Sequence, residues 1–216
     1  MRPHVLPHTD VALPALGVLV SGRGSNLAAI LHAVETGELC ARVGLVISSR
    51  PDAPALEIAM AHSVPTRVIA PKEYASRAEA GAAIVAALRG VGVALVVLAG
   101  YKPILDACVI QAYPHRILNI HPSLLPAFAG GMAPRPQTEA LAAGVKLSGC
   151  TVHFVTEDVD AGPIIAQAAV PVRDDDTVES LSARILAQEH QLFSQAIALV
   201  LAGNARVEGR RVIIQR

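Results

Sequence analysis

The chain contains no tryptophan, and its aromatic content is only 3%. Its three cysteines are scattered along the sequence, so neither a disulfide framework nor a zinc site is expected. It also has no excess charge of either sign, because 18 basic and 18 acidic residues cancel. We therefore expect no nucleic-acid or membrane partner, and the cysteine usage fits a reducing compartment, the cytoplasm.

Long apolar runs are also missing. A helix that spans a bilayer needs about 18 apolar residues or more, whereas the apolar stretch at 11–20 is interrupted by Pro14 and Gly17. We expect residues 1–14 to form a flexible leader. We expect residues 15–216 to form a single domain, because a chain of this length can bury one sizeable core.

Short apolar segments alternate with helical segments over the first 100 residues. We expect strands at 15–20, 42–47, 66–70 and 93–99, with helices at 27–36, 54–62 and 75–89 between them. This alternation predicts an α/β fold, a doubly wound and mostly parallel sheet with helices on both faces. Ligands of such sheets bind where the strand order reverses, which we place between the first and fourth strands.

The turn after the first strand is rich in glycine and reads Ser-Gly-Arg-Gly-Ser-Asn at 21–26. A strand, a glycine-rich turn and a helix N-terminus together form an anion cradle, because free backbone N–H groups point outward there. A dinucleotide site is disfavoured, since Leu27 replaces the third glycine and the next strand leads into Ser48-Ser49-Arg50 instead of an acidic residue. A single phosphate monoester suits this turn better.

A second polar cluster follows the apolar strand expected at 116–120. Asn119 and His121 lie two residues apart, so their side chains share one side of the strand, which Pro122 then ends. A carboxamide beside an imidazole can donate to a developing oxyanion and can carry a proton near neutral pH. The plainer alternative is a polar strand end that is capped by proline.

The carboxyl-terminal part contains further acids. A loop with three acidic residues, 157–163, lies between strands expected at 148–156 and 164–172, and we expect His153 in the first of them to be a hydrogen-bonded structural residue. Asp176 to Glu179 has capping-box spacing and opens a long helix to about residue 201. Glu189 falls on the apolar stripe of that helix, which is costly unless it is paired. Residues 205–216 read as a hairpin.

These motifs resemble those of a known family. Asn-x-His-Pro-Ser-Leu-Leu-Pro at 119–126 is similar to the signature of the folate-dependent formyltransferases, and Val-Asp-Ala-Gly-Pro-Ile at 159–164 resembles their second motif. The resemblance runs from about residue 16 to about residue 203. Its neighbouring motifs are similar to the branch that formylates glycinamide ribonucleotide in de novo purine biosynthesis.

The resemblance implies the formyltransferase fold, 10-formyltetrahydrofolate as co-substrate, no metal, and direct transfer to the amine of glycinamide ribonucleotide through a tetrahedral intermediate. It divides the domain into a phosphate-binding half at about 15–100 and a folate-binding, catalytic half at about 101–203. It implies that the catalytic residues are Asn119, His121 and Asp160, with Asp160 favouring the protonated imidazole. The implied substrate-binding residues are Gly24, Ser25, Asn26, Arg77 and Glu189. The implied cofactor-binding residues are Lys102, Ile104, Leu105, Asn119, Val155, Thr156 and Asp158.

The chain departs from the family pattern in two places. Pro103 stands where the family usually has an arginine that helps to hold the glutamate carboxylate of the folate, and we hypothesise that Lys102 supplies this charge instead. Residues 128–135 replace the more common Phe-Pro-Gly-x-His pattern, so we transfer no role for that histidine and expect a differently shaped loop beside the site.

Three alternatives stay open at this point. Methionyl-tRNA formyltransferases share the 119–126 motif, but they usually carry an RNA-binding carboxyl-terminal domain and an aspartate where this chain has Pro163. A 10-formyltetrahydrofolate hydrolase would normally carry a regulatory domain, which 14 leading residues could not form. A non-catalytic phosphate-binding domain would not need all three predicted catalytic residues. Both a monomer and a homodimer are compatible with the sequence.

Overall fold

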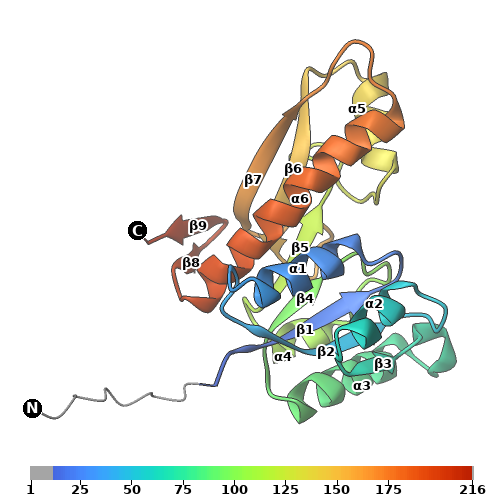
Figure 1. Ribbon diagram of the computed structural model, residues 1–216, viewed down its shortest axis with the longest axis vertical. Helices are drawn as coiled ribbons and strands as arrows, with labels where there is room; N and C mark the ends of the chain where they lie inside the picture. Colours follow the sequence, from blue (N-terminus) through green and yellow to red (C-terminus); the bar gives the residue numbers. More distant parts are fainter. Residues whose placement is uncertain (1–11, 216) are drawn as a thin grey trace, which may run out of the picture.

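The computed structural model describes residues 12–215, so most of the predicted leader lies outside the described residues. Nine strands are present in this range. They are β1 (Ala15–Val20), β2 (Arg42–Ser48), β3 (Thr66–Val68), β4 (Val93–Leu98), β5 (Ile117–His121), β6 (Leu147–Phe154), β7 (Ile164–Pro171), β8 (Ala205–Glu208) and β9 (Arg211–Ile214). All nine join one sheet, in the order β3-β2-β1-β4-β5-β6-β7-β9-β8 (Figure 1).

The strand order confirms the predicted fold class. Strands β3, β2, β1, β4 and β5 pair in parallel, and the order reverses between β1 and β4, where the switch point was expected. Strands β6 and β7 add to the sheet in antiparallel fashion and extend away from the parallel part (Figure 1). The last two strands form the predicted hairpin, and β9 pairs in parallel with β7.

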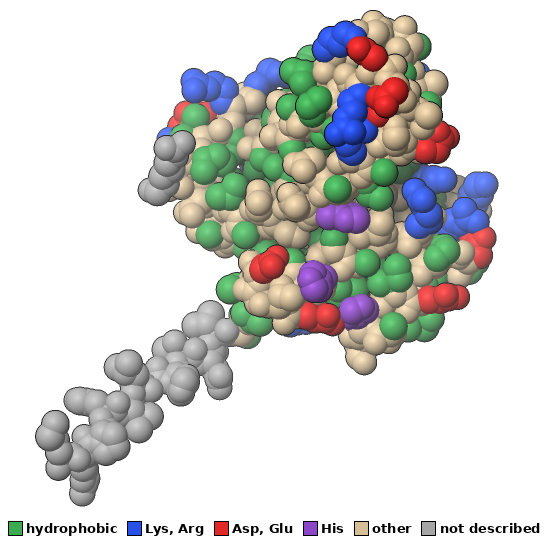
Figure 2. All heavy atoms as spheres, turned by 45° about the horizontal axis from the view of Figure 1, so that its top comes forward, with side chains coloured by type: hydrophobic (Ala, Val, Ile, Leu, Met, Phe, Trp, Pro, Cys, Tyr) green, Lys and Arg blue, Asp and Glu red, His purple; other side chains and the backbone are tan. Residues whose placement is uncertain are grey.

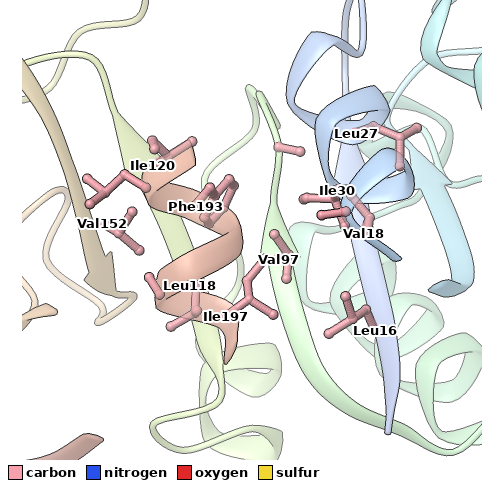
Figure 3. Close-up of a cluster of buried hydrophobic side chains, with 14 of the residues drawn as sticks. Leu16, Val18, Leu27, Ile30, Val97, Leu118, Ile120, Val152, Phe193 and Ile197 are labelled. Carbon is pink, nitrogen blue, oxygen red and sulfur yellow. The ribbon is translucent and has the colours of Figure 1, made fainter. Parts of the chain in front are cut away.

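Helices cover both faces of the sheet. They are α1 (Ser25–Glu35), α2 (Ala55–Ala61), the short 3₁₀ helix η1 (Pro71–Glu73), α3 (Arg77–Gly90), α4 (Ala107–Ala112), α5 (Arg135–Ala142) and α6 (Val178–Leu201). On one face, α1 packs over β1 while α6 packs over β5 and β6 (Figure 3). Alternate strand residues point into this layer, and they include Leu16, Val18, Leu118 and Ile120.

The opposite face packs against α3 and α4. The intervening strand residues, among them Leu19, Ile47 and Val96, are buried there together with Ile84 and Leu88 of α3. Gly17 of β1 allows this close packing, because a Cβ atom at that position would lie 2.4 Å from Leu88 Cδ2. The buried faces therefore hold the parallel strands rigidly, and the carboxyl ends of β1, β4 and β5 meet at one edge.

Some local predictions differ from the structure. The capping box of α6 joins Thr177 to Ser180, not Asp176 to Glu179, and Asp176 instead accepts hydrogen bonds from Ser180 and Arg184. The helices η1 and α4 were not predicted, since both are too short to show a period.

Over residues 12–215, no helix is long and apolar enough to cross a membrane. Acidic and basic side chains are interspersed on the face shown in Figure 2, as the zero net charge of the sequence suggests.

Candidate active site

The first part of the site is the turn between β1 and α1. Helix α1 begins at Ser25, no side chain caps its N-terminus, and its first turn contains no acidic residue. The N–H groups of this turn are therefore free to bind an anion, and the helix dipole adds to the attraction. The predicted anion cradle is present as a geometric feature.

Gly24 is required at this turn by its backbone and by its neighbour. Its φ angle is +82°, and a Cβ atom would lie 2.7 Å from the Cβ of Ala55. The N–H of Ala55 also donates to the carbonyl of Gly22 at 3.1 Å, which ties the turn to α2. Only glycine satisfies both the left-handed conformation and the close approach of α2.

The second part of the site is a cluster of polar side chains at the end of β5. Asn119 and His121 project from this strand, and Asp160 reaches the cluster from the loop between β6 and β7. The Nδ1 atom of His121 lies 3.2 Å from Oδ2 of Asp160, and the side chains are only 3% and 11% exposed. His121 and Asp160 thus contact each other in a buried position, and the half-buried Asn119 lines the same cavity.

The loop that carries Asp160 is tightly constrained. Asp160 has a φ angle of +51°, and Gly162 follows two residues later. A Cβ atom on Gly162 would lie 1.8 Å from the carbonyl oxygen of Phe154, so a larger residue would push the loop away from β6. The glycine of the second motif therefore serves to place the Asp160 carboxylate.

The loop after Pro126 covers the same pair. His121 Nε2 lies 3.0 Å from the carbonyl oxygen of Phe128, and the N–H of Gly130 donates to Asp160 Oδ2 at 2.8 Å. A carbonyl and a carboxylate only accept hydrogen bonds, so both ring nitrogens of His121 face acceptors. Each ring nitrogen of His121 is therefore positioned to donate to an acceptor when it carries a hydrogen.

The charge of Asp160 is held by its neighbours. Burial alone would raise the pKa of its carboxyl group, but hydrogen bonding to His121, the interaction with His153, the charge of the His121 imidazole and the N–H of Gly130 outweigh burial. The pKa of Asp160 is therefore held far below its ordinary value, and the carboxylate stays ionised at neutral pH.

Glu189 is the second buried carboxylate of the site. It projects from α6, is 7% exposed, and accepts a hydrogen bond from Asn26 Nδ2 at 2.9 Å. Burial raises the pKa of Glu189, and the hydrogen bond from Asn26 opposes that shift. Asn26 Oδ1 is buried without a partner among residues 12–215, so both side chains can still take a hydrogen-bond donor.

A cavity of about 610 Å³ connects the cradle to the cluster. Every predicted site residue except one lines it: Gly24, Ser25, Asn26, Lys102, Ile104, Leu105, Asn119, His121, Val155, Thr156, Asp158, Asp160 and Glu189. The exception is Arg77, which is exposed in the first turn of α3. Its charge lowers the pKa of the nearby Asp106 carboxyl group, although the hydrogen bond from the Cys108 N–H lowers that pKa more. The structure does not bring Arg77 to the cavity.

The outer part of the cavity is more apolar. Ile104, Met132 and Val159 come from three different loops around it and are 57%, 42% and 52% exposed. Behind them, the backbone N–H of Lys102 donates to the hydroxyl of Ser21 at 2.9 Å, and that hydroxyl also contacts Ser49. This buried contact ties the loop after β4 to the turn that forms the anion cradle.

Two contributors were missed in the sequence. His153, expected to be structural, lies directly opposite Asn119 in the β5–β6 pairing and contacts it. Gly130 contributes a backbone N–H that donates to Asp160 Oδ2, and a backbone group of this kind leaves no side-chain pattern in the sequence. The β5–β6 register would have revealed His153, but no turn signal in the sequence sets that register.

Within the described part of the chain, no group of three or more His, Cys, Asp or Glu residues could hold a metal ion.

Comparisons with known proteins agree with this geometry. Residues 16–197 match the family described as formyl transferase. The chain is 40% identical to a phosphoribosylglycinamide formyltransferase of Bacillus subtilis, over 88% of this chain and 96% of that protein. It is similar in structure to glycinamide ribonucleotide transformylase 1 of Symbiobacterium toebii, with 50% identity, a TM-score of 0.91, and coverage of 94% of this chain and 95% of that chain.

Longer relatives contain the same region. The trifunctional purine biosynthetic protein adenosine-3 of Gallus gallus is 44% identical over 89% of this chain. The match covers only 19% of that protein, so the chain spans about a fifth of the length of this relative.

Proposed function

The chain belongs to the formyl transferase family, and from this membership we propose that it transfers the formyl group of 10-formyltetrahydrofolate to the amine of glycinamide ribonucleotide. This reaction is a step of de novo purine biosynthesis. The names of its similar proteins support the choice of acceptor. The observation that carries the proposal is one cavity that joins an anion cradle to the Asn119, His121 and Asp160 cluster.

The cradle suits the ribonucleotide phosphate. Its free N–H groups at Ser25 and Asn26 would donate to the oxygens of a phosphate monoester, which does not need the long groove of a dinucleotide site. Glu189 and the free Oδ1 of Asn26 lie on the same cavity and would accept hydrogen bonds from the remainder of the substrate, including its amine. Arg77 keeps its predicted role at the phosphate only if its side chain turns toward the cradle.

The outer cavity suits the folate. Ile104, Leu105 and Val155 offer apolar walls for a flat ring, and backbone groups of the loops on either side can hydrogen-bond its edge. Lys102 would meet the glutamate carboxylate. The co-substrate supplies the formyl group and the nitrogen that leaves.

Asn119 and His121 would stabilise the oxyanion that develops when the amine attacks the formyl carbon. A carboxamide N–H and an imidazolium N–H are strong donors in a buried site, and they act more strongly as the negative charge grows. Because Nε2 of His121 is bound to the carbonyl of Phe128, it must exchange that carbonyl for the substrate oxygen. Use of His121 therefore requires a shift of the 127–131 loop.

Asp160 would assist the proton transfer that the reaction needs. Its ionised carboxylate lies 3.2 Å from Nδ1 of His121 and would help to move the proton from the attacking amine to the departing folate nitrogen, directly or through water. No serine or cysteine of the sequence stands in a recognisable nucleophile motif, so we propose a direct transfer. The three cysteines would stay reduced in the cytoplasm, and the proposal involves no metal and no nucleic acid.

Turnover of the purified protein tests this proposal. Absorbance would follow 10-formyltetrahydrofolate with and without glycinamide ribonucleotide. We expect deformylation only when the ribonucleotide is present, together with formylated ribonucleotide as product. Cofactor loss at the same rate without an amine would indicate a hydrolase, and turnover with another amine alone would replace the acceptor.

A further inference from the structure

His153 has a defined set of partners inside the cluster. It lies on β6 directly opposite Asn119 of β5, is 2% exposed, and uses both ring nitrogens. Nδ1 lies 2.9 Å from the carbonyl oxygen of Phe154, and Nε2 lies 3.1 Å from Nδ2 of Asn119. Buried polar nitrogens need hydrogen-bond partners, so the identity of these two partners determines how the ring is oriented.

These partners determine where the proton lies. A carbonyl oxygen can only accept, so Nδ1 of His153 carries the hydrogen. In the neutral ring Nε2 is then an acceptor, and the amide nitrogen of Asn119 donates to it. The tautomer therefore specifies which end of the carboxamide faces His153.

Asp160 is the more distant neighbour of this nitrogen. Its Oδ1 atom lies 3.6 Å from Nε2 of His153, whereas Nδ2 of Asn119 lies 3.1 Å from the same nitrogen and Oδ2 of Asp160 lies 3.2 Å from Nδ1 of His121. Asn119 is thus the nearer hydrogen-bond partner of His153 within the cluster.

We infer that His153 is a positioning residue that orients the carboxamide of Asn119, an inference that rests on the proposed formyl transfer. With one N–H bound to His153, the nitrogen end of Asn119 is held in place and its second N–H is available for the developing oxyanion. Without His153, the carboxamide can rotate by half a turn and present its oxygen, which repels an oxyanion. The expected loss therefore concerns the chemical step, not substrate binding.

A double-mutant cycle tests this coupling. We expect His153→Leu to lower kcat by at most the factor of about 10²–10³ expected for Asn119→Ala, with both KM values near those of the wild type. When His153→Leu is combined with Asn119→Ala, kcat should fall no further than in Asn119→Ala alone. His153→Gln retains an acceptor and should recover part of kcat. An equal loss in both backgrounds, an unchanged kcat for His153→Leu, or no advantage of Gln over Leu would overturn the inference.

A second readout works on the wild-type protein. Nitrogen-15 NMR of the histidine rings should show His153 protonated at Nδ1 and bare at Nε2; a proton on Nε2 would overturn the inference even if His153→Leu failed to fold. Melting curves and folate binding check the folding of each variant. If wild-type protein showed no ribonucleotide-dependent turnover, the proposed function would fail while the NMR readout still decided the orientation of Asn119.

Discussion

The two ends of the cavity are built in different ways. The anion cradle at 22–26 consists of backbone N–H groups, a left-handed glycine and a helix N-terminus, all within one short stretch of sequence. The proposed catalytic cluster consists of buried and half-buried side chains from β5, from β6 and from the following loop, held by hydrogen bonds to a fourth segment at 128–130. One end depends on backbone shape and the other on side-chain chemistry.

This difference predicts different responses to mutation. A backbone cradle is damaged by added bulk and tolerates changes of side-chain chemistry, so its failures should appear in substrate binding. A side-chain cluster tolerates little change in charge or hydrogen bonding, so its failures should appear in turnover. Four measurements test this difference between the two ends of the cavity.

The largest effect is expected at the catalytic end. Asp160→Asn keeps the shape of the side chain but removes the negative charge beside His121, so kcat should fall by about 10²–10⁴ with little change in either KM. Steady-state kinetics measures this. Glu157→Gln makes the same acid-to-amide change on an exposed residue of the same loop and should keep kcat. Near-normal turnover of folded Asp160→Asn would contradict the assignment.

A smaller effect is expected at the cradle. Gly24→Ala forces a non-glycine residue into the left-handed region and against Ala55, a strain of about 1–3 kcal/mol. We expect the KM for the ribonucleotide to rise on the order of tenfold, as 1.4 kcal/mol corresponds to a factor of ten, while kcat changes little. Gly37→Ala is the matched control, because Gly37 has a similar left-handed φ angle of +78° beyond the other end of α1 and does not line the cavity. A loss confined to kcat would remove the contrast between the two ends.

The ionised state of Asp160 can be measured through stability. Because its pKa is lowered in the folded protein, its contribution is present above the unfolded value of about 3.9 and is lost as the pH falls below about 5. The free energy of unfolding should therefore decrease more steeply with acid in the wild type than in Asp160→Asn, by up to about 1.4 kcal/mol per pH unit. Urea titrations between pH 7 and pH 3 measure it, and parallel curves would argue against a charged Asp160.

The smallest effect is expected at the exposed rim of the cavity. Lys102→Ala should raise the KM for the folate about two- to fivefold, since an exposed ion pair contributes at most about 1 kcal/mol. Lys72→Ala removes an exposed lysine away from the cavity and serves as the control. If the folate KM stayed unchanged in Lys102→Ala, the hypothesis that Lys102 supplies the charge of the missing family arginine would be wrong.

Much of the fold could be predicted because its signals are local. Each strand of the parallel half is a short apolar run, and the observed bounds of β1 and β4 agree with the prediction within one residue. The motif at 119–126 and the glycine-rich turn are also contiguous, so their residues could be named directly. The capping box of α6 was misplaced by one residue, because Asp176 and Thr177 are both good cap residues and only the observed hydrogen bonds separate them.

The alternation of strands and helices, the position of the switch point and the identities of the predicted catalytic residues could be inferred from the sequence alone. The way in which segments distant in sequence meet could not. The antiparallel register of β5 and β6 places His153 opposite Asn119, the backbone at 128–130 contacts His121 and Asp160, and α3 leaves Arg77 outside the cavity. The physical reason is that periodicity and turn chemistry act over neighbouring residues, whereas strand register and loop docking depend on the packing of the whole core.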